Sequence, residues 1–322
     1  MGVSRMGGEG DRPPSVSSRG NGSMIAPRTS GIGEPFSPGS QARGGWRRWW
    51  GRLFIVLVTL LALVYGGVSA QLYFSQSSKV FRPRQGLAAT PAEWGVLFQE
   101  VHFLSQEHRL HGWWIPGDSE RSVILFFHGN ASVISGQKGH VELFQRMGLG
   151  VFLFDYRGYG LSEGTPSEAG VYADAEAAWS HLTGVLGMPE KRVILYGHSL
   201  GGGVATWLAA RHAPQAMMLE GTFLSIPAVG EELYPYLPIR LLSRIWFDNA
   251  SRIGQIRVPL LILHSRDDTV IFPRHGRELF ALANDPKTFL ETSGSHNTSV
   301  SQGGLAVEEG MRRFVADLQK PR

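Results

Sequence analysis

The chain has 322 residues, of which 43% are hydrophobic, enough to bury one large core and leave segments outside it. Its formal net charge is +4. Most of the excess lies in residues 1–52, which carry eight arginines, so the nearly neutral remainder argues against a nucleic-acid-binding domain. The absence of cysteine excludes disulfides, thiolate metal ligands and a cysteine nucleophile.

The first 45 residues are rich in glycine, serine, proline and arginine and show no apolar period. A segment of this composition cannot bury enough apolar surface to offset the entropy of ordering its chain. We therefore expect residues 1–45 to form a disordered, basic tail.

A long apolar segment follows this tail. Residues 53–74 contain no charge and would extend roughly 33 Å as a helix, which is enough to cross a bilayer. Aromatic rings, which favour the membrane interface, lie toward the ends of the segment. They are Trp46, Trp49, Trp50, Tyr65 and Tyr73. We predict a transmembrane anchor at residues 46–74.

The charges beside this anchor predict its orientation. Basic residues lie on both sides, at Arg43, Arg47, Arg48, Arg52, Lys79, Arg82 and Arg84. Their small excess on the N-terminal side favours a single-pass protein with a cytoplasmic N-terminus and a domain on the non-cytoplasmic side. The alternative is a cleaved signal peptide, because the strongest apolar run covers only residues 53–65 and small residues precede Gln71.

From about Val96 onward, apolar runs of strand length alternate with segments of helical pattern. The first two runs are separated only by a short turn, which predicts an antiparallel start to a mostly parallel sheet. Later runs such as VILFF are continuously apolar, so helices must cover both faces. We expect helices at residues 132–147, 167–186, 199–212, 273–284 and 304–319, within an α/β domain spanning residues 75–322.

The stretch LYGHSLGGG joins one predicted strand to a helix and contains the pattern Gly197-x-Ser199-x-Gly201. Small flanking residues allow a tight turn that projects the Ser199 hydroxyl from the end of the sheet. Open α/β sheets bind ligands beyond the carboxyl ends of their strands, where this turn lies. A structural glycine turn would explain the pattern nearly as well, so further residues must distinguish the two.

A serine nucleophile needs a base to accept its proton and an acid to orient that base. The runs LLILHSRDD and FLETSGSHN supply the acid and then His296, each after a late strand. The acid is Asp268 or its neighbour Asp267. Backbone N–H groups of Leu200 and of Asn130, which follows the strand in FFHGN, are the candidate oxyanion donors.

Seven motifs together resemble the α/β-hydrolases of the Bem46-like group, membrane-anchored bacterial relatives of the eukaryotic ABHD serine hydrolases. The motifs are LHGWWIPG, FFHGNAS, FDYRGYGLSEG, LYGHSLGGG, LEGTFLSIP, ILHSRDDTVI and GSHN. The resemblance covers the chain from about Gln71 onward and implies an α/β-hydrolase fold with a Ser-His-Asp triad. In that group the acid lies in H-G-x-x-D-x-x-V/I, which favours Asp268 over Asp267. Ser265 replaces the usual glycine, and GSHN replaces GGHN.

About forty residues at 221–257 separate two predicted strands and indicate a small helical cap. Its aromatic side chains could line an acyl pocket or pack the cap onto the sheet. We expect Asp155, Glu163 and Glu220 to be structural, accepting hydrogen bonds from backbone donors and from Arg157.

These features predict a serine hydrolase that cleaves a small-molecule carboxylic ester or thioester through an acyl-enzyme. A serine peptidase or amidase, or a non-catalytic scaffold on the same fold, remains the alternative. We expect no cofactor and no metal, because the glycines of GYGLSEG do not match a dinucleotide loop and no H-E-x-x-H or Walker pattern occurs. The expected partners are the acyl substrate and membrane lipid, with no nucleic acid.

Overall fold

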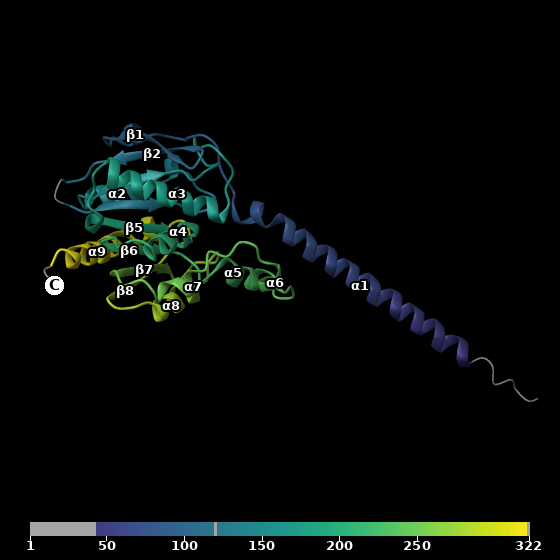
Figure 1. Ribbon diagram of the computed structural model, residues 1–322. Helices are drawn as coiled ribbons and strands as arrows, with labels where there is room; N and C mark the ends of the chain where they lie inside the picture. Colours follow the sequence, from purple (N-terminus) through teal and green to yellow (C-terminus); the bar gives the residue numbers. More distant parts are fainter. Residues whose placement is uncertain (1–42, 119–120, 321–322) are drawn as a thin grey trace, which may run out of the picture. The chain divides into compact units, whose positions relative to one another are not determined.

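The computed structural model describes residues 43–118 and 121–320, and Figure 1 shows the arrangement of its elements. Almost all of the predicted tail at residues 1–45 lies outside the described residues. The chain divides into two compact units, and the boundary between Thr59 and Leu60 falls within the first helix. The sheet and the candidate site belong to the second unit, Leu60–Arg322.

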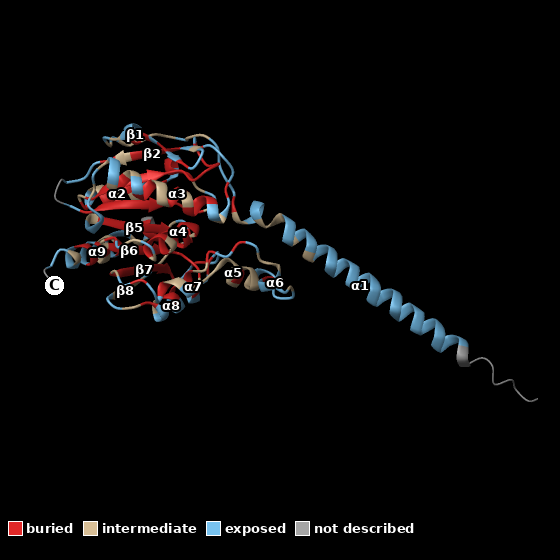
Figure 2. Ribbon diagram, in the orientation of Figure 1, coloured by how far each residue is buried: buried red, intermediate tan, exposed pale blue. Residues whose placement is uncertain are grey.

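Helix α1 (Arg43–Val80) contains the predicted membrane segment and continues past Phe74. Among the described helices, it is the one long and apolar enough to cross a membrane. Its apolar side chains are exposed along nearly the whole segment, as the pale blue colour in Figure 2 indicates. The helix is therefore not a core helix of the hydrolase-like domain, which would be buried.

The domain is built on one sheet of eight strands in the order β1-β2-β4-β3-β5-β6-β7-β8. β1 pairs with β2 and β2 pairs with β4 in antiparallel fashion, and all the other pairings are parallel. This confirms the predicted antiparallel start and mostly parallel sheet. The strands are β1 (Gln99–Ser105), β2 (His108–Ile115), β3 (Val123–Phe127), β4 (Gly150–Phe154), β5 (Val193–His198), β6 (Ala216–Glu220), β7 (Leu260–Ser265) and β8 (Lys287–Thr292).

Helices cover both faces of this sheet, as predicted. Alternate side chains of β3 point to opposite faces, so Leu125 joins one buried cluster and Ile124 joins the other. Helices α2 and α9 supply the second cluster, whereas α3, α4, α7 and α8 supply the first. The bounds are α2 (Lys138–Arg146), α3 (Glu168–Ser180), α4 (Leu200–Ala209), α7 (Asn249–Ile253), α8 (Pro273–Leu282) and α9 (Ser299–Leu318).

Two predicted helices begin elsewhere in the structure: α2 begins at Lys138 and not at residue 132, and α9 begins at Ser299 and not at residue 304. Two adjacent glycines, Gly303 and Gly304, favour a helix boundary in a sequence-based prediction. In the structure the helical segment runs through them with a kink, because Gly304 adopts a positive φ of 56°.

Three short helices occupy the predicted cap region between β6 and β7. They are α5 (Ile226–Leu233), α6 (Ile239–Leu242) and α7 (Asn249–Ile253). Ser225 caps α5 by accepting a hydrogen bond from the Ala228 N–H at 3.2 Å. Proline at 235 and at 238 interrupts the backbone between α5 and α6, so the cap consists of short pieces.

Candidate active site

Ser199 lies in a sharp turn between β5 and α4. Its backbone adopts φ 53° and ψ −116°, an unfavourable region for a residue with a side chain. A Cβ on Gly197 would lie 2.5 Å from the Gly201 carbonyl oxygen, and one on Gly201 would lie 2.0 Å from that of Phe127. The turn therefore requires glycine at both positions, as the sequence pattern predicts.

The Ser199 hydroxyl belongs to a chain of two hydrogen bonds. His296 Nε2 lies 2.9 Å from Ser199 Oγ, and His296 Nδ1 lies 2.7 Å from Asp268 Oδ2. The Asp268 and His296 side chains are buried, and they follow β7 and β8 respectively. Residues from three separate strand ends thus meet at one edge of the sheet.

Asp268 is held by the backbone as well as by His296. Its Oδ1 accepts hydrogen bonds from the N–H groups of Val270 and Ile271, both at 2.9 Å. Burial alone would raise the pKa of Asp268, but its hydrogen bond and charge interaction with His296 and the two backbone donors bring that pKa below its usual range. The carboxylate is therefore ionised at neutral pH.

The alternative acid, Asp267, points elsewhere. Its exposed side chain accepts a hydrogen bond from the Gly294 N–H through Oδ2 at 3.1 Å. The structure thus brings Asp268 to His296 and directs the neighbouring carboxylate to the loop that follows β8.

The two predicted oxyanion donors lie on segments that pack together. β3 and β5 are neighbours, with Phe127 paired to Gly197, so the loop after β3 lies beside the Ser199 turn. A Cβ on Gly129 would lie 3.5 Å from the Ser199 Cβ. Leu200 is the first residue of α4, where backbone N–H groups are free of helical partners. The Asn130 side chain donates from Nδ2 to the Val80 carbonyl oxygen at 2.9 Å and ties this loop to the end of α1.

One close approach was not predicted from the sequence. Gly221 follows β6 with a positive φ of 53°, and a Cβ there would lie 3.3 Å from the His296 ring and 3.6 Å from Asp268 Oδ2. A side chain at this position would press on both partners of Ser199. The sequence does show a glycine in EGTF directly after a predicted strand. It does not show that the loops carrying His296 and Asp268 lie against this glycine.

A buried polar network lies behind His296. The carboxylate of Glu220 accepts hydrogen bonds from Tyr196 Oη at 2.7 Å and Ser299 Oγ at 2.5 Å, and lies 2.9 Å from His140 Nε2. Burial would raise the pKa of Glu220, but His198 and His140 beside it bring that pKa well below the usual range. Because Ser299 follows His296 closely, this network holds the loop that carries His296.

Glu220 is thus structural, as expected, although its partners are side chains and not backbone donors. The other two expected carboxylates do accept from the backbone: Asp155 from the Ile134 N–H and Glu163 from the Arg109 N–H, both at 2.9 Å. Burial raises the pKa of Asp155 to about 7.

The expected partner of Arg157 was wrong. Its guanidinium pairs with Asp174 on α3, with Nη2 2.7 Å from Oδ1 and both side chains buried. Asp174 lies within a predicted helix, and no local spacing signals which charge on that helix faces the loop containing Arg157.

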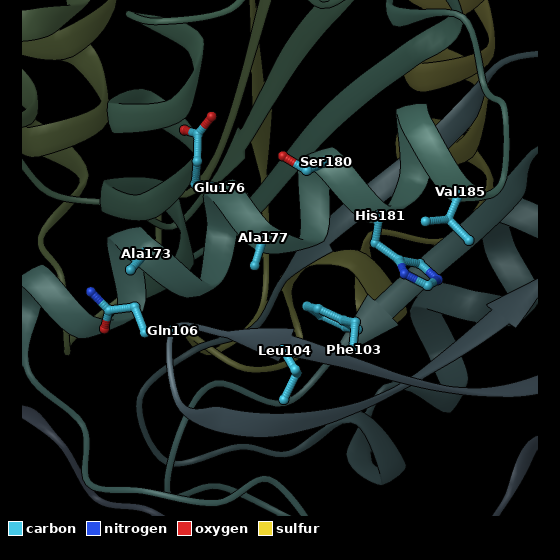
Figure 3. Close-up of a pocket in the computed structure, with 9 residues that line it drawn as sticks. All are labelled: Phe103, Leu104, Gln106, Ala173, Glu176, Ala177, Ser180, His181 and Val185. Atoms are coloured by element: carbon cyan, nitrogen blue, oxygen red, sulfur yellow. The ribbon is translucent and has the colours of Figure 1, made fainter.

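A cavity of about 580 Å³ lies between β1 and α3 (Figure 3). Phe103 and Leu104 come from β1, and the facing side chains come from α3 and the π-helical segment His181–Val185 that follows it. Its lining includes neither Ser199 nor His296, so it is separate from the candidate site. At the nearby edge of the sheet, Glu100, His102 and His111 have ligand atoms within 4.8 Å of one another and could hold a metal ion.

The sheet order and the strand-turn-helix around Ser199 define an α/β-hydrolase fold. An esterase of Pyrococcus furiosus, Pf2001, superposes with a TM-score of 0.64 at 19% identity, covering 75% of this chain and 98% of that one. An acylaminoacyl peptidase of Pyrococcus horikoshii superposes with a TM-score of 0.54 at 16% identity, covering 68% of this chain and 40% of that one.

Sequence relatives agree with the fold. Residues 118–249 match the family model described as serine aminopeptidase, S33. An uncharacterized protein of Mycobacterium tuberculosis is 32% identical over 81% of this chain and 94% of its own length. The α/β-hydrolase domain-containing protein WAV2 of Arabidopsis thaliana is 32% identical over 75% of this chain and 87% of its own length. The uncharacterized membrane protein YNL320W of Saccharomyces cerevisiae is 33% identical over 67% of this chain and 79% of its own length. The chain therefore belongs to the α/β-hydrolase superfamily.

Proposed function

We propose that this protein is a serine hydrolase that cleaves a carboxylic ester or thioester through an acyl-enzyme. The observation that carries the proposal is the hydrogen-bonded chain from Ser199 through His296 to Asp268, in which all three side chains come from different strand ends. In this role His296 Nε2 accepts the Ser199 proton, and Asp268 keeps the other ring nitrogen protonated.

The reaction proceeds in two halves. Ser199 Oγ attacks the acyl carbonyl carbon, the backbone N–H groups of Leu200 and Asn130 stabilise the oxyanion, and His296 returns the proton to the departing alcohol or thiol. A water molecule then gives its proton to His296 and attacks the acyl-enzyme, which releases the acid and restores Ser199. Gly197 and Gly201 contribute by holding the serine in its strained turn.

A serine peptidase or amidase is the second candidate. The observation that favours it is the match of residues 118–249 to a family described as a serine aminopeptidase. The same three side chains would serve either reaction, since the leaving group differs and the nucleophile does not. An ester and an amide with the same acyl group distinguish the two by their kcat/KM.

We also propose that α1 anchors the protein in a membrane through residues 46–74, as a single-pass protein with its domain on the non-cytoplasmic side. The exposed apolar surface of α1 and the yeast relative named as a membrane protein support the anchor. Reporter fusions before residue 46 and at the C-terminus test the orientation. A cytoplasmic C-terminal reporter would contradict it.

Labelling with a fluorophosphonate probe tests the enzymatic proposal. We expect the wild type to be labelled and the variants Ser199→Ala and His296→Ala to remain unlabelled. Ser251→Ala is the matched control, because Ser251 is exposed on α7 and should not alter labelling. p-Nitrophenyl esters of increasing chain length then report the acyl preference. A folded wild-type protein that is never labelled would favour the scaffold alternative.

A further inference from the structure

The cap carries an apolar segment most of whose residues are exposed in the described part of the chain. Residues 233–242, which we call the cap tip, read LYPYLPIRLL and contain one charge, Arg240. Tyr236 is 90% exposed, Leu241 86% and Leu233 65%. Side chains of this kind clustered in ten residues mark an interaction site more often than a solvated loop.

The cap lies along α1 and makes three hydrogen bonds with it, two through the cap tip and one through Arg244, just beyond it. Tyr65 Oη donates to the Tyr236 carbonyl oxygen at 3.1 Å, and Gln76 Nε2 donates to that of Leu242 at 2.6 Å. The Arg244 N–H donates to Gln76 Oε1 at 2.7 Å. Tyr65 and Gln76 are eleven residues apart, so these contacts extend over roughly 16 Å of the helix.

The position of Tyr65 sets the depth of the cap tip. Phe74 is the last residue of the predicted anchor, and Tyr65 precedes it by nine residues, or about 14 Å of helix. That length is close to half of the ~30 Å hydrocarbon core of a bilayer. A membrane that contains this part of α1 therefore also contains the segment around Tyr236.

The hydrogen bonds of the cap tip suit such an environment. Non-helical backbone in hydrocarbon is tolerated only where protein groups satisfy its polar atoms. Here Tyr65 and Gln76, both on α1, satisfy two cap carbonyls. The single charge, Arg240, is paired with Glu231, with Nε 2.8 Å from Oε1, so it does not face lipid as an isolated cation.

We propose that the cap tip is embedded in the bilayer leaflet next to α1, so that the cap is a membrane-bound surface. This inference rests on the proposed membrane anchor and not on the proposed hydrolysis. A cavity of about 480 Å³ lies beside the same contacts, lined by Phe74 of α1, Phe81 just after α1, Tyr172 of α3 and Ile245 of the cap, among others. The embedded cap places this cavity at the membrane surface.

Single engineered cysteines can test whether the cap tip lies in the bilayer. The chain contains no cysteine of its own, so a thiol-reactive dye labels only the introduced position. Tyr236→Cys and Leu241→Cys in the full chain are labelled with the environment-sensitive dye NBD and reconstituted into phosphatidylcholine vesicles. Neither side chain makes the hydrogen bonds described above, so both variants should fold. Leu305→Cys on α9, 84% exposed, is the matched control for an exposed apolar residue, and Leu61→Cys reports whether α1 is inserted.

We expect NBD at 236, 241 and 61 to show blue-shifted emission, quenching by acyl-chain doxyl lipids and protection from aqueous iodide. NBD at 305 should show the opposite. If 61 is quenched by doxyl lipid but 236 and 241 behave like 305, the cap tip is in water and the proposal is wrong. Protection from iodide without quenching by lipid would mean that protein covers the cap tip, which also overturns it. Loss of quenching at 61 would refute the anchor itself. None of these readouts requires turnover.

Discussion

The substitution Asp268→Asn tests the proposed acid because the two carboxylate oxygens of Asp268 have different partners. Oδ1 accepts two backbone N–H groups, and Oδ2 faces His296 Nδ1. In the asparagine variant, the amide oxygen must take the side with the two backbone donors. The opposite orientation would leave both backbone donors facing an NH₂ group, and each unsatisfied donor would cost about 1–3 kcal/mol of stability.

The NH₂ group of the variant therefore faces His296 Nδ1, which must become the acceptor. The ring proton then moves to Nε2, and that nitrogen can no longer accept the proton of Ser199. We expect kcat to fall by about 10⁴, the loss typical of a wrong histidine tautomer. At 1.36 kcal/mol for each factor of ten, this corresponds to about 5 kcal/mol of transition-state stabilisation.

Steady-state hydrolysis of a p-nitrophenyl ester measures the loss, with thermal unfolding as the check that the variant is folded. Asp267→Asn is the matched control, since its exposed side chain keeps an oxygen that can accept from the Gly294 N–H. The Asp267 carboxylate faces the Gly294 N–H and not His296, so kcat should stay within about twofold of wild type, a change of less than about 0.5 kcal/mol in the activation barrier. Equal losses in the two variants, or a larger loss in Asp267→Asn, would refute the assignment of the acid.

Two further substitutions test the packing around the site. Gly201→Ala places a Cβ 2.0 Å from the Phe127 carbonyl oxygen, so we expect the free energy of unfolding to fall by about 3 kcal/mol and Tm to fall by roughly 6–12 °C. Gly139→Ala on α2 is the control: its Cβ meets no atom within 4 Å, and Tm should be unchanged or higher. Glu220→Gln should lower the free energy of unfolding measured in urea at pH 7. The difference from wild type should shrink as pH falls below 4.5, because the pKa of Glu220 is depressed in the folded protein and acid therefore removes the stability that the ionised carboxylate gives the wild type. A deficit that grows with acid would contradict the ionised state of Glu220.

The mostly parallel sheet with its antiparallel start and the turn at Ser199 follow from local patterns in the sequence. Continuous apolar runs predict strands covered on both faces, and the spacing of Gly197 and Gly201 predicts the sharp turn. The structure confirms the fold class, and it places Ser199 and His296 within hydrogen-bonding distance. The catalytic roles stay predictions until they are measured.

Contacts between distant residues could not be predicted from the sequence. His140 and Glu220 are 80 positions apart, and their pairing depends on how α2 packs against the sheet. The same holds for Arg157 and Asp174. The choice between adjacent carboxylates depended on the resemblance, because only the backbone path after β7 determines which of them faces His296.

β8 is the last strand of the chain and lies at the edge of the sheet, held by β7 alone among the strands. His296 follows it directly, whereas Ser199 follows a central strand. A chain that has folded through β7 thus has its nucleophile in place but lacks the base that activates it. Enzymatic activity would then report that this edge strand has docked on the sheet.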